Sequence, residues 1–184
     1  MNIFYLSENP KIAAIEHVDK HVVKMILETA QLLCTAHRVL DGVEKTISTK
    51  TKNGKNKNVI VYSLDAQKDA LFYKTTHKNH PCAIWARQNI NNYMWLYQLF
   101  VELCNEYTFR YGKTHRTDFL LRKVLATPPT NISNDGFTPP PQAMPEQYKH
   151  TNPVTAYRQY YIGAKKEFAK WSLRPTPEWF NIGV

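Results

Sequence analysis

A stripe of ionisable and polar side chains near the start of the chain is the first candidate for chemistry. At helical steps of three and four residues, the stripe runs through His17, His21, Lys24, Glu28, Gln31, Thr35 and Arg38. The residues around it are almost all apolar, which is typical of a buried helix with one narrow polar window. A carboxylate held beside imidazole and ammonium groups there suits general acid/base catalysis. We predict three catalytic residues, Glu28, His21 and Lys24. His17 and Gln31 are predicted to bind substrate; an ordinary solvent-facing stripe of ion pairs is the alternative.

A second group of candidates stands at the start of another helical pattern. His77 and His80 lie in the sequence THKNHP, just before Pro81, where the free backbone N–H groups of a helix start favour an anion. Arg87 and Asn91 begin a polar line along the helix that follows, which would form the opposite wall of a cleft. We predict that these four polar residues bind substrate, the alternative being that the histidines only cap and pack the helix. The HxxH spacing is a weak metal signal, so we predict neither a metal site nor a cofactor.

Four lysines in a predicted β-hairpin suggest a site for a polyanion. A two-residue turn at Asn53-Gly54 would pair Lys52 with Lys55 and Lys50 with Lys57, which places all four on one face. Like charges opposite one another repel, so phosphate would stabilise such a face. We predict that this basic ribbon binds nucleic acid. The alternative is a protruding hairpin that lysine keeps soluble.

The last helical pattern interleaves tyrosines with basic residues. Arg158 and Lys165 lie among Tyr157, Tyr160 and Tyr161, an arrangement found on surfaces that stack bases and bind phosphate. We predict that Arg158 and Lys165 contact nucleic acid. A helix with a tyrosine core face and a lysine outer face is the alternative.

Composition and charge agree with a nucleic-acid partner. The 184 residues carry a formal net charge of +9 at pH 7, with 43% hydrophobic residues, and excess lysine and arginine attract phosphate. No run approaches the roughly 20 apolar residues that a membrane-spanning helix needs. The first residues contain no basic leader, and the three cysteines form no CxxC pair. We expect DNA or RNA as partner, no membrane contact, and a reducing cytoplasm, which would be the host cytoplasm for a phage protein.

The predicted fold is mainly α: a compact single helical domain (1–184) of about five helices, with one protruding β-hairpin (about 45–62) and a long Pro-rich loop (about 126–151). The helical patterns run over about 12–40, 64–73, 81–110, 117–125 and 153–171. The first pattern is one long helix or two abutting ones. Pro81 and Pro153 are suited to first helical positions, and Gly112 ends the third pattern. The first helix and the helix from Pro81 would then wall a polar cleft.

The chain resembles an uncharacterised protein family of tailed-phage genomes. Four segments carry this resemblance: DKHVVKMILE, THKNHPCAIWAR, GFTPPPQAMPEQYK and AYRQYY. They span most of the chain, but the resemblance implies no activity.

The first helix is also similar, more distantly, to that of the phage pyrimidine-dimer DNA glycosylases with AP-lyase activity. Asp19, His21 and Glu28 match the family's Asp-x-His and the glutamate seven residues after the histidine. The resemblance implies that an N-terminal α-amine attacks the sugar C1′ to form a Schiff base, with Glu28 as its acid/base partner. Leu27 stands where the family has an arginine, and the residue after Met1 is the bulky Asn2.

These features together predict an enzyme acting on DNA, a glycosylase/lyase for a damaged or modified pyrimidine. The base would be flipped into a pocket, where Glu28 stabilises the developing cationic sugar or relays a proton, and Lys24 is an alternative amine nucleophile. One alternative is a transferase or hydrolase acting on a nucleotide or modified phage base. Another is a non-catalytic module that binds nucleic acid or a host protein, such as an anti-defence protein.

Overall fold

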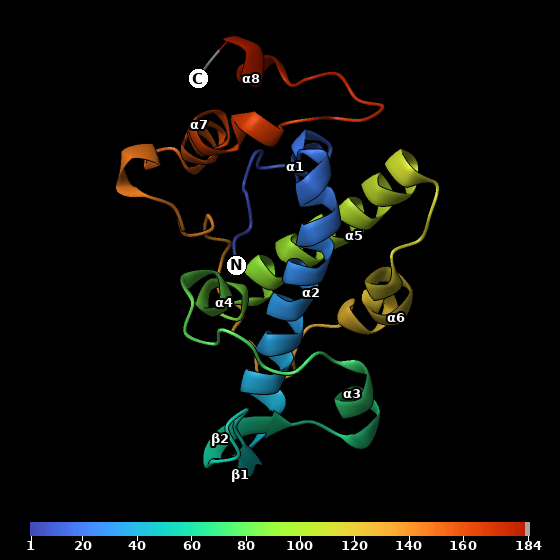
Figure 1. Cartoon of the computed structure of the whole chain (residues 1–184), viewed down its shortest axis with the longest axis vertical. Coiled ribbons are helices and arrows are strands. Elements are labelled where there is room, and N and C mark those ends of the chain that lie inside the picture. Colours follow the sequence, from blue (N-terminus) through green and yellow to red (C-terminus); the bar gives the residue numbers. More distant parts are fainter. Residues whose placement is uncertain (183–184) are drawn as a thin grey trace.

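Two long helices that cross one another organise the chain. The computed structural model describes residues 1–182, and Figure 1 shows α2 crossing in front of α5, with the other elements arranged around this pair. The α-helices are α1 (Pro10–Glu16), α2 (Asp19–Asp41), α3 (Ala66–Leu71), α4 (Pro81–Ala86), α5 (Ile90–Tyr111), α6 (Arg116–Leu125), α7 (Pro153–Lys165) and α8 (Glu178–Ile182). The remaining elements are the strands β1 (Val43–Lys50) and β2 (Asn56–Ser63) and the short 3-10 helices η1 (Glu146–Tyr148) and η2 (Lys166–Phe168). A mainly α fold with one hairpin is therefore confirmed, with eight α-helices in the described part where about five were expected.

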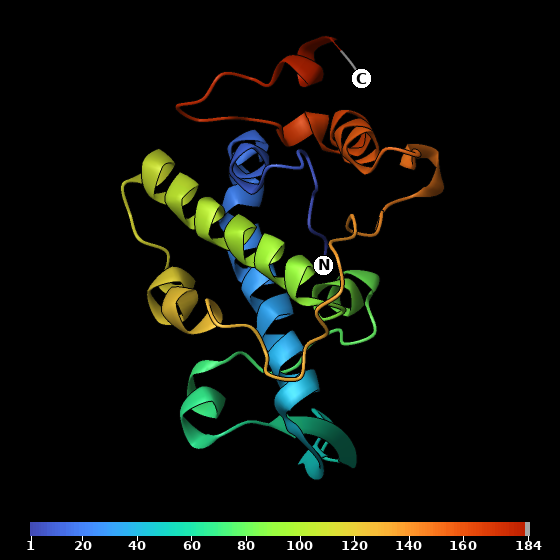
Figure 2. The same ribbon diagram turned by 180° about the vertical axis from the view of Figure 1, so that it is seen from behind.

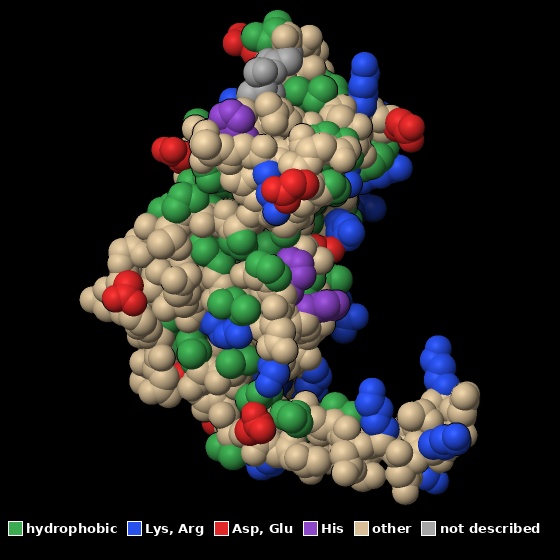
Figure 3. Space-filling view, turned by 90° about the vertical axis from the view of Figure 1, so that its left-hand side faces the viewer, with side chains coloured by type: hydrophobic (Ala, Val, Ile, Leu, Met, Phe, Trp, Pro, Cys, Tyr) green, Lys and Arg blue, Asp and Glu red, His purple; other side chains and the backbone are tan. Residues whose placement is uncertain are grey.

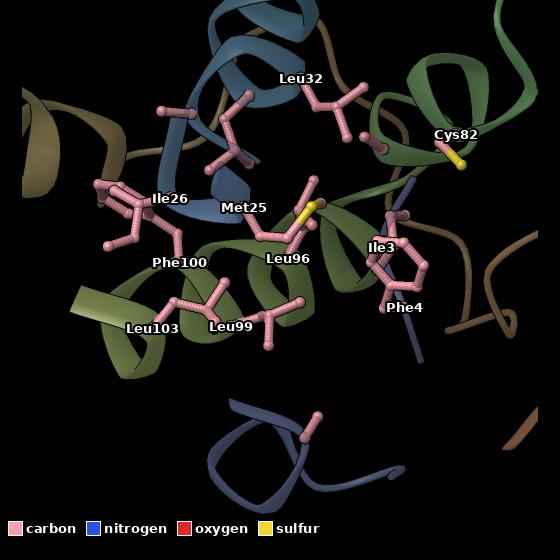
Figure 4. Packing of buried hydrophobic residues seen from close by; sticks show 14 of the residues in the cluster. Ile3, Phe4, Met25, Ile26, Leu32, Cys82, Leu96, Leu99, Phe100 and Leu103 are labelled. Atoms are coloured by element: carbon pink, nitrogen blue, oxygen red, sulfur yellow. The ribbon is translucent and has the colours of Figure 1, made fainter. Parts of the chain in front are cut away.

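The core lies where α2 packs directly on α5. Met25 and Ile26 of α2 lie among Leu96, Leu99 and Phe100 of α5, all of them fully buried (Figure 4). Seen from behind, α5 crosses the back of α2 diagonally (Figure 2). The apolar pattern of the first helix thus predicted a buried helix correctly. The two helices meet through this apolar layer, so the expected polar cleft does not lie between α2 and α5.

The helix expected from Pro81 to Arg110 is interrupted after its first six residues. α4 ends at Ala86, and the Asn89 side chain caps the start of α5 by accepting a 2.8 Å hydrogen bond from the backbone N–H of Asn92. The Asn92 amide then binds the carbonyl of Trp85 and both the backbone and the hydroxyl of Thr138. The prediction of one uninterrupted helix was wrong because this asparagine pair exchanges helical hydrogen bonds for contacts with the Pro-rich segment.

The Pro-rich segment from 126 to 151 packs along the body as a belt. Asp41, at the end of α2, accepts hydrogen bonds from the backbone N–H groups of Thr130 and Asn131. Farther along, Trp85 and Tyr157 donate to the carbonyls of Thr138 and Pro141, each at 2.7 Å. Apart from the single turn η1, the segment has no regular structure, as its prolines predicted.

The β-hairpin forms a protruding arm, but its register differs from the predicted one. Lys50 pairs with Asn56 and Thr49 pairs with Lys57, so Lys50 and Lys57 lie on opposite faces. A five-residue loop, 51–55, joins the strands, and Gly54 takes the left-handed conformation with φ 75°. The two-residue turn was therefore wrong, and with it the single lysine face. Figure 3 shows the arm reaching out from the body, with lysine side chains on several sides of it.

One buried arginine holds the base of this arm. The Arg38 guanidinium, only 1% exposed, donates to the carbonyls of Tyr62, Phe72 and Tyr73 and pairs with the Asp69 carboxylate. The Arg38 side chain lay on the predicted polar stripe but is covered by the segment that follows α3. No helix among residues 1–182 combines the length and apolarity that crossing a membrane requires.

Candidate functional site

Glu28 lies in the middle of the predicted stripe. This part of the stripe reaches solvent, and its charged side chains are paired. Its side chain is 15% exposed, and Oε1 lies 3.3 Å from the Lys24 ammonium one turn earlier on α2. The second oxygen, Oε2, accepts a 3.3 Å hydrogen bond from the backbone N–H of Asn2. The carboxylate therefore has a nitrogen group on each oxygen, one from the helix and one from the start of the chain.

The start of the chain is fixed beside α2 by the Asn2 side chain. Its Oδ1 accepts from the backbone N–H of Ile3 at 2.7 Å, and its Nδ2 donates to the carbonyl of Ala143 in the Pro-rich belt at 2.8 Å. The turn that follows holds Phe4 at φ 53°, a conformation that a non-glycine residue rarely adopts. Because residues 3–6 are buried, the first residues cannot swing freely away from Glu28. Both views place the N-terminus beside α2 and α4 (Figures 1 and 2).

His80 joins this group from α4. Its Nδ1 accepts from the backbone N–H of Cys82 at 3.2 Å, which caps the helix. In the neutral ring that acceptor role leaves the proton on Nε2. Burial lowers the pKa of His80, the positive N-terminus lowers it further, and the nearby Glu28 opposes both. Glu28 thus contacts Lys24 and the start of the chain directly, and His80 lies near enough for both charges to act on its pKa. We call these residues the Glu28 cluster.

A shallow cavity lies next to the Glu28 cluster. It has a volume of about 720 Å³, and its lining includes Pro81, which follows His80, and Ala143, whose carbonyl binds Asn2. The rest of the lining comes from the Pro-rich belt and the start of α7. Lys24, Glu28 and His80 are not among the lining residues, so the cavity borders the cluster only through Pro81 and Ala143.

Two histidines of the predicted stripe are buried instead of facing substrate. His17 is fully buried, and its Nδ1 lies 2.6 Å from the carbonyl of Ala13. His21 stacks on Phe4 with ring centroids 4.3 Å apart and shares a 2.6 Å hydrogen bond with the Tyr161 hydroxyl. Burial lowers the pKa of His17 to about 4 and that of His21 to about 3, so both rings are neutral at pH 7. We assign them to the wall that supports the N-terminal segment.

The other predicted substrate-binding residues are divided between the site and the scaffold. Gln31 is half-buried on α2, one turn beyond Glu28. His77 is exposed and strained at φ 48°, with its Nδ1 2.6 Å from the Thr76 hydroxyl. Arg87 donates to the carbonyl of Lys78 and Asn91 to that of Asp135, each at 2.7 Å. The last two therefore hold loops in place, away from the Glu28 carboxylate.

The predicted nucleic-acid contacts are likewise divided. Lys50, Lys52, Lys55 and Lys57 are all exposed on the arm or its loop. By contrast, Arg158 donates to the carbonyl of Leu6 at 2.9 Å and contacts the Glu16 carboxylate, which makes it a structural link between α7 and α1. Lys165 is half-exposed, with its ammonium 4.6 Å from the centre of the Tyr160 ring. Figure 3 shows histidine side chains, with lysines or arginines nearby, on the edge of the body that faces the hollow above the arm.

Asp19, the third residue of the glycosylase-like spacing, has a structural role. One of its oxygens binds the Arg110 guanidinium at 2.8 Å, and both accept hydrogen bonds from Ser172. Its carboxylate therefore fixes the corner between α1 and α2. Within residues 1–182, no three His, Cys, Asp or Glu side chains gather as metal ligands would.

The residues that the sequence did not single out are Asn2 and the N-terminal segment it holds. No periodic pattern marks residues 1–6, and the contact between Asn2 and Glu28 spans 26 positions. The one available signal was the glycosylase resemblance, which pairs the start of the chain with the helix glutamate.

Comparison with known proteins leaves both family resemblances untested. No protein-family model, curated protein or solved structure matches the chain. A function for this chain must therefore be inferred from the geometry around Glu28.

Proposed function

We propose that the chain is a DNA-acting enzyme that releases a damaged or modified pyrimidine through an amine nucleophile, as a glycosylase/lyase. The observation that supports it is the pair of nitrogens held 3.3 Å from the two oxygens of Glu28. Covalent catalysis of this kind needs an amine beside a carboxylate that can accept and return its proton.

The proposed reaction begins at C1′ of the deoxyribose. The lone pair of the free amine forms a bond to C1′ while the C1′–base bond breaks and its electron pair leaves with the base, which takes a proton from solvent. The new C1′–N group loses one proton to Glu28. The sugar ring then opens, its oxygen takes up a proton, and a protonated imine remains. Glu28 can next remove a proton from C2′, so that the 3′ phosphate leaves with the C3′–O electron pair and the strand is cut.

Two amines are candidates for the nucleophile. The Lys24 ammonium is 67% exposed and already lies against Glu28. The nitrogen of Asn2 occupies the equivalent place on the other oxygen, but it becomes an α-amine only in a chain from which Met1 has been removed. Both use the same carboxylate, so the position of the covalent bond distinguishes them.

Borohydride reduction should trap the protein covalently on an oligonucleotide that carries one abasic site. The exposed C1′ aldehyde of such a site forms the same imine without requiring the correct base. We expect one adduct per chain, located by mass spectrometry either on Lys24 or on the first residue of the mature chain. The Lys24→Met substitution should abolish an adduct on Lys24 and leave an adduct on the first residue of the mature chain. Lys123→Met, which removes an exposed amine on α6, is the matched control and should trap as the wild type does.

Either of two results contradicts this mechanism. An adduct yield no higher than that of the same protein after heat denaturation excludes a dedicated amine. Adducts scattered over many surface lysines indicate only the general reactivity of a basic protein with an aldehyde.

The arm is proposed to hold the DNA backbone. Replacing Lys50, Lys52, Lys55 and Lys57 with glutamine should flatten the dependence of log Kd on log salt, by roughly 0.9 for each phosphate of duplex DNA that the arm then leaves unneutralised. The matched control replaces four exposed cations away from the arm, Lys11, Lys113, Arg116 and Lys123, and changes the net charge equally. Affinity measured over a range of salt concentrations should respond to the first set only. Equal effects of the two sets would mean that the arm contributes to binding only through the net charge of the protein.

A further inference from the structure

Partly exposed aromatic rings and lysines lie together on the surface formed by η1, α7, η2 and the start of α2. Tyr148, Tyr160 and Phe168 are all partly exposed. The ammonium of Lys165 lies 4.6 Å from the centre of the Tyr160 ring, and that of Lys20 lies 5.1 Å from the centre of the Phe168 ring. We call these five residues the aromatic–lysine patch.

The rings of this patch rest on a rigid aromatic support. Phe4 lies nearly parallel to Tyr160, at an interplanar angle of 18° and a centroid distance of 6.2 Å, and it stacks on His21. His21 in turn meets Phe168 edge to face at 5.6 Å. Because Phe4 and His21 are buried and hydrogen-bonded or packed on both sides, the exposed rings above them are held in fixed orientations.

The position of the Tyr148 ring depends on the absence of a side chain at Gly163. A Cβ atom added at Gly163, in the interior of α7, would collide with the Tyr148 ring. Glycine inside a helix costs about 0.5–1 kcal/mol relative to alanine. Here it leaves the space in which Tyr148 lies against α7, with its ring centroid 5.3 Å from that of Tyr160.

The patch is positively charged and adjoins the Glu28 cluster. Lys165 and Lys24 both lie close enough to His21 to lower its pKa, after the larger effect of burial. Besides the patch lysines, the exposed Lys166 and Lys170 add positive charge. The carboxylates nearby are Glu167, which is exposed, Glu146, which pairs with Lys149, and Glu28, which pairs with Lys24. Phosphate is therefore attracted to a surface that also carries partly exposed aromatic rings.

We infer that the aromatic–lysine patch binds unpaired nucleotides of a nucleic-acid strand that leads to Glu28. The part of this inference that rests on the proposed function is that the strand leads to Glu28. Aromatic rings stack on bases whose faces are free, whereas the bases of a duplex already cover one another. Lysines between the rings match the phosphates between successive bases. The substrate class is thus single-stranded DNA, or duplex DNA opened around the target base.

Fluorescence anisotropy can compare the affinity of the protein for a labelled oligothymidine with its affinity for a blunt hairpin duplex of equal charge. The oligothymidine has about 15 nucleotides, close to the upper site size of single-strand binding folds. The wild type should bind the single strand more tightly. Tyr160→Ala and Phe168→Ala should each weaken single-strand binding by about tenfold, as loss of one stacked base does, and change duplex binding much less. Phe119→Ala is the matched control, because that ring is 83% exposed on α6, outside the patch.

A second pair of variants separates stacking from folding. Tyr160→Phe and Phe168→Tyr keep a ring and should retain wild-type affinity, while thermal unfolding checks that the alanine variants are folded. Photo-crosslinking with 5-iododeoxyuridine in the single strand should label peptides containing Tyr148, Tyr160 or Phe168. Unchanged affinity in the folded alanine variants, or equal loss in Phe119→Ala, overturns the inference.

These outcomes are independent of catalysis. A protein that binds the single strand through the patch but forms no borohydride adduct retains this inference and loses the proposed function. A protein that traps on abasic DNA while the alanine variants bind normally retains the proposed function and loses this inference.

Discussion

Replacing Glu28 with glutamine is expected to slow base release and strand cleavage by about 10²- to 10⁴-fold, the usual contribution of a general acid/base group. Glutamine has the same shape but cannot accept the proton of the attacking amine or remove one from C2′. The hydrogen bond from Asn2 to Oε2 can be kept by the amide oxygen, so the start of the chain should stay in place. Binding to single-stranded and duplex DNA should therefore change less than twofold. Single-turnover cleavage and anisotropy on the same oligonucleotide measure the two effects.

The stability cost of this substitution should be small. Lys24 is two-thirds exposed, and an exposed ion pair contributes only about 0–1 kcal/mol. Glu102→Gln, at a partly exposed carboxylate on α5, is the matched control and should leave turnover unchanged. Full turnover in Glu28→Gln would exclude this carboxylate from catalysis and leave the chain as a binding module.

The partial success of the sequence in predicting this site has a physical cause. Helical periodicity places Lys24 and Glu28 one turn apart, and their ion pair is a local consequence of that spacing. Periodicity does not reveal what covers the rest of a face. The segment after α3 buries Thr35 and Arg38, and the N-terminal segment buries His21, so only the middle of the predicted stripe remains open.

His80 and Asn2 reach Glu28 through contacts between segments far apart in the sequence. The sequence identified His80 as a helix cap from Pro81 after it and predicted it in the same site as Glu28, 52 positions earlier, but it did not show which contacts bring the two segments together. The hairpin shows the same limit on a smaller scale. Asn53-Gly54 located the turn correctly, yet the hydrogen bonds of Thr51 with Lys55 enlarge it by three residues and shift the register.

Replacing Arg110 with methionine is expected to lower the free energy of unfolding by about 3–5 kcal/mol, the usual cost of removing one partner from a buried ion pair. The Arg110 side chain is fully buried and binds Glu106 at 2.7 Å and Asp19 at 2.8 Å. It also donates to the carbonyls of Ile15 and His17, where α1 ends. Methionine fills a similar volume but leaves the Glu106 carboxylate, itself 3% exposed, with Arg174 as its remaining partner. Urea unfolding followed by circular dichroism measures the loss.

Lys68→Met is the matched control, because it removes one cation from a pair in which both side chains are about half exposed, and it should cost little. The pH dependence gives a second test. Burial raises the pKa of Asp19, but hydrogen bonds from Ser172 and Arg110 outweigh it and leave that pKa below the ordinary 3.8. A lowered carboxyl pKa stabilises the fold above 3.8, and this contribution is lost as the pH falls through and below that value. Arg110→Met should lose less stability over the same acid range than the wild type. An equal loss would mean that Arg110 does not hold Asp19 ionised. Apolar contacts would then maintain the corner between α1 and α2, against which the N-terminal segment packs.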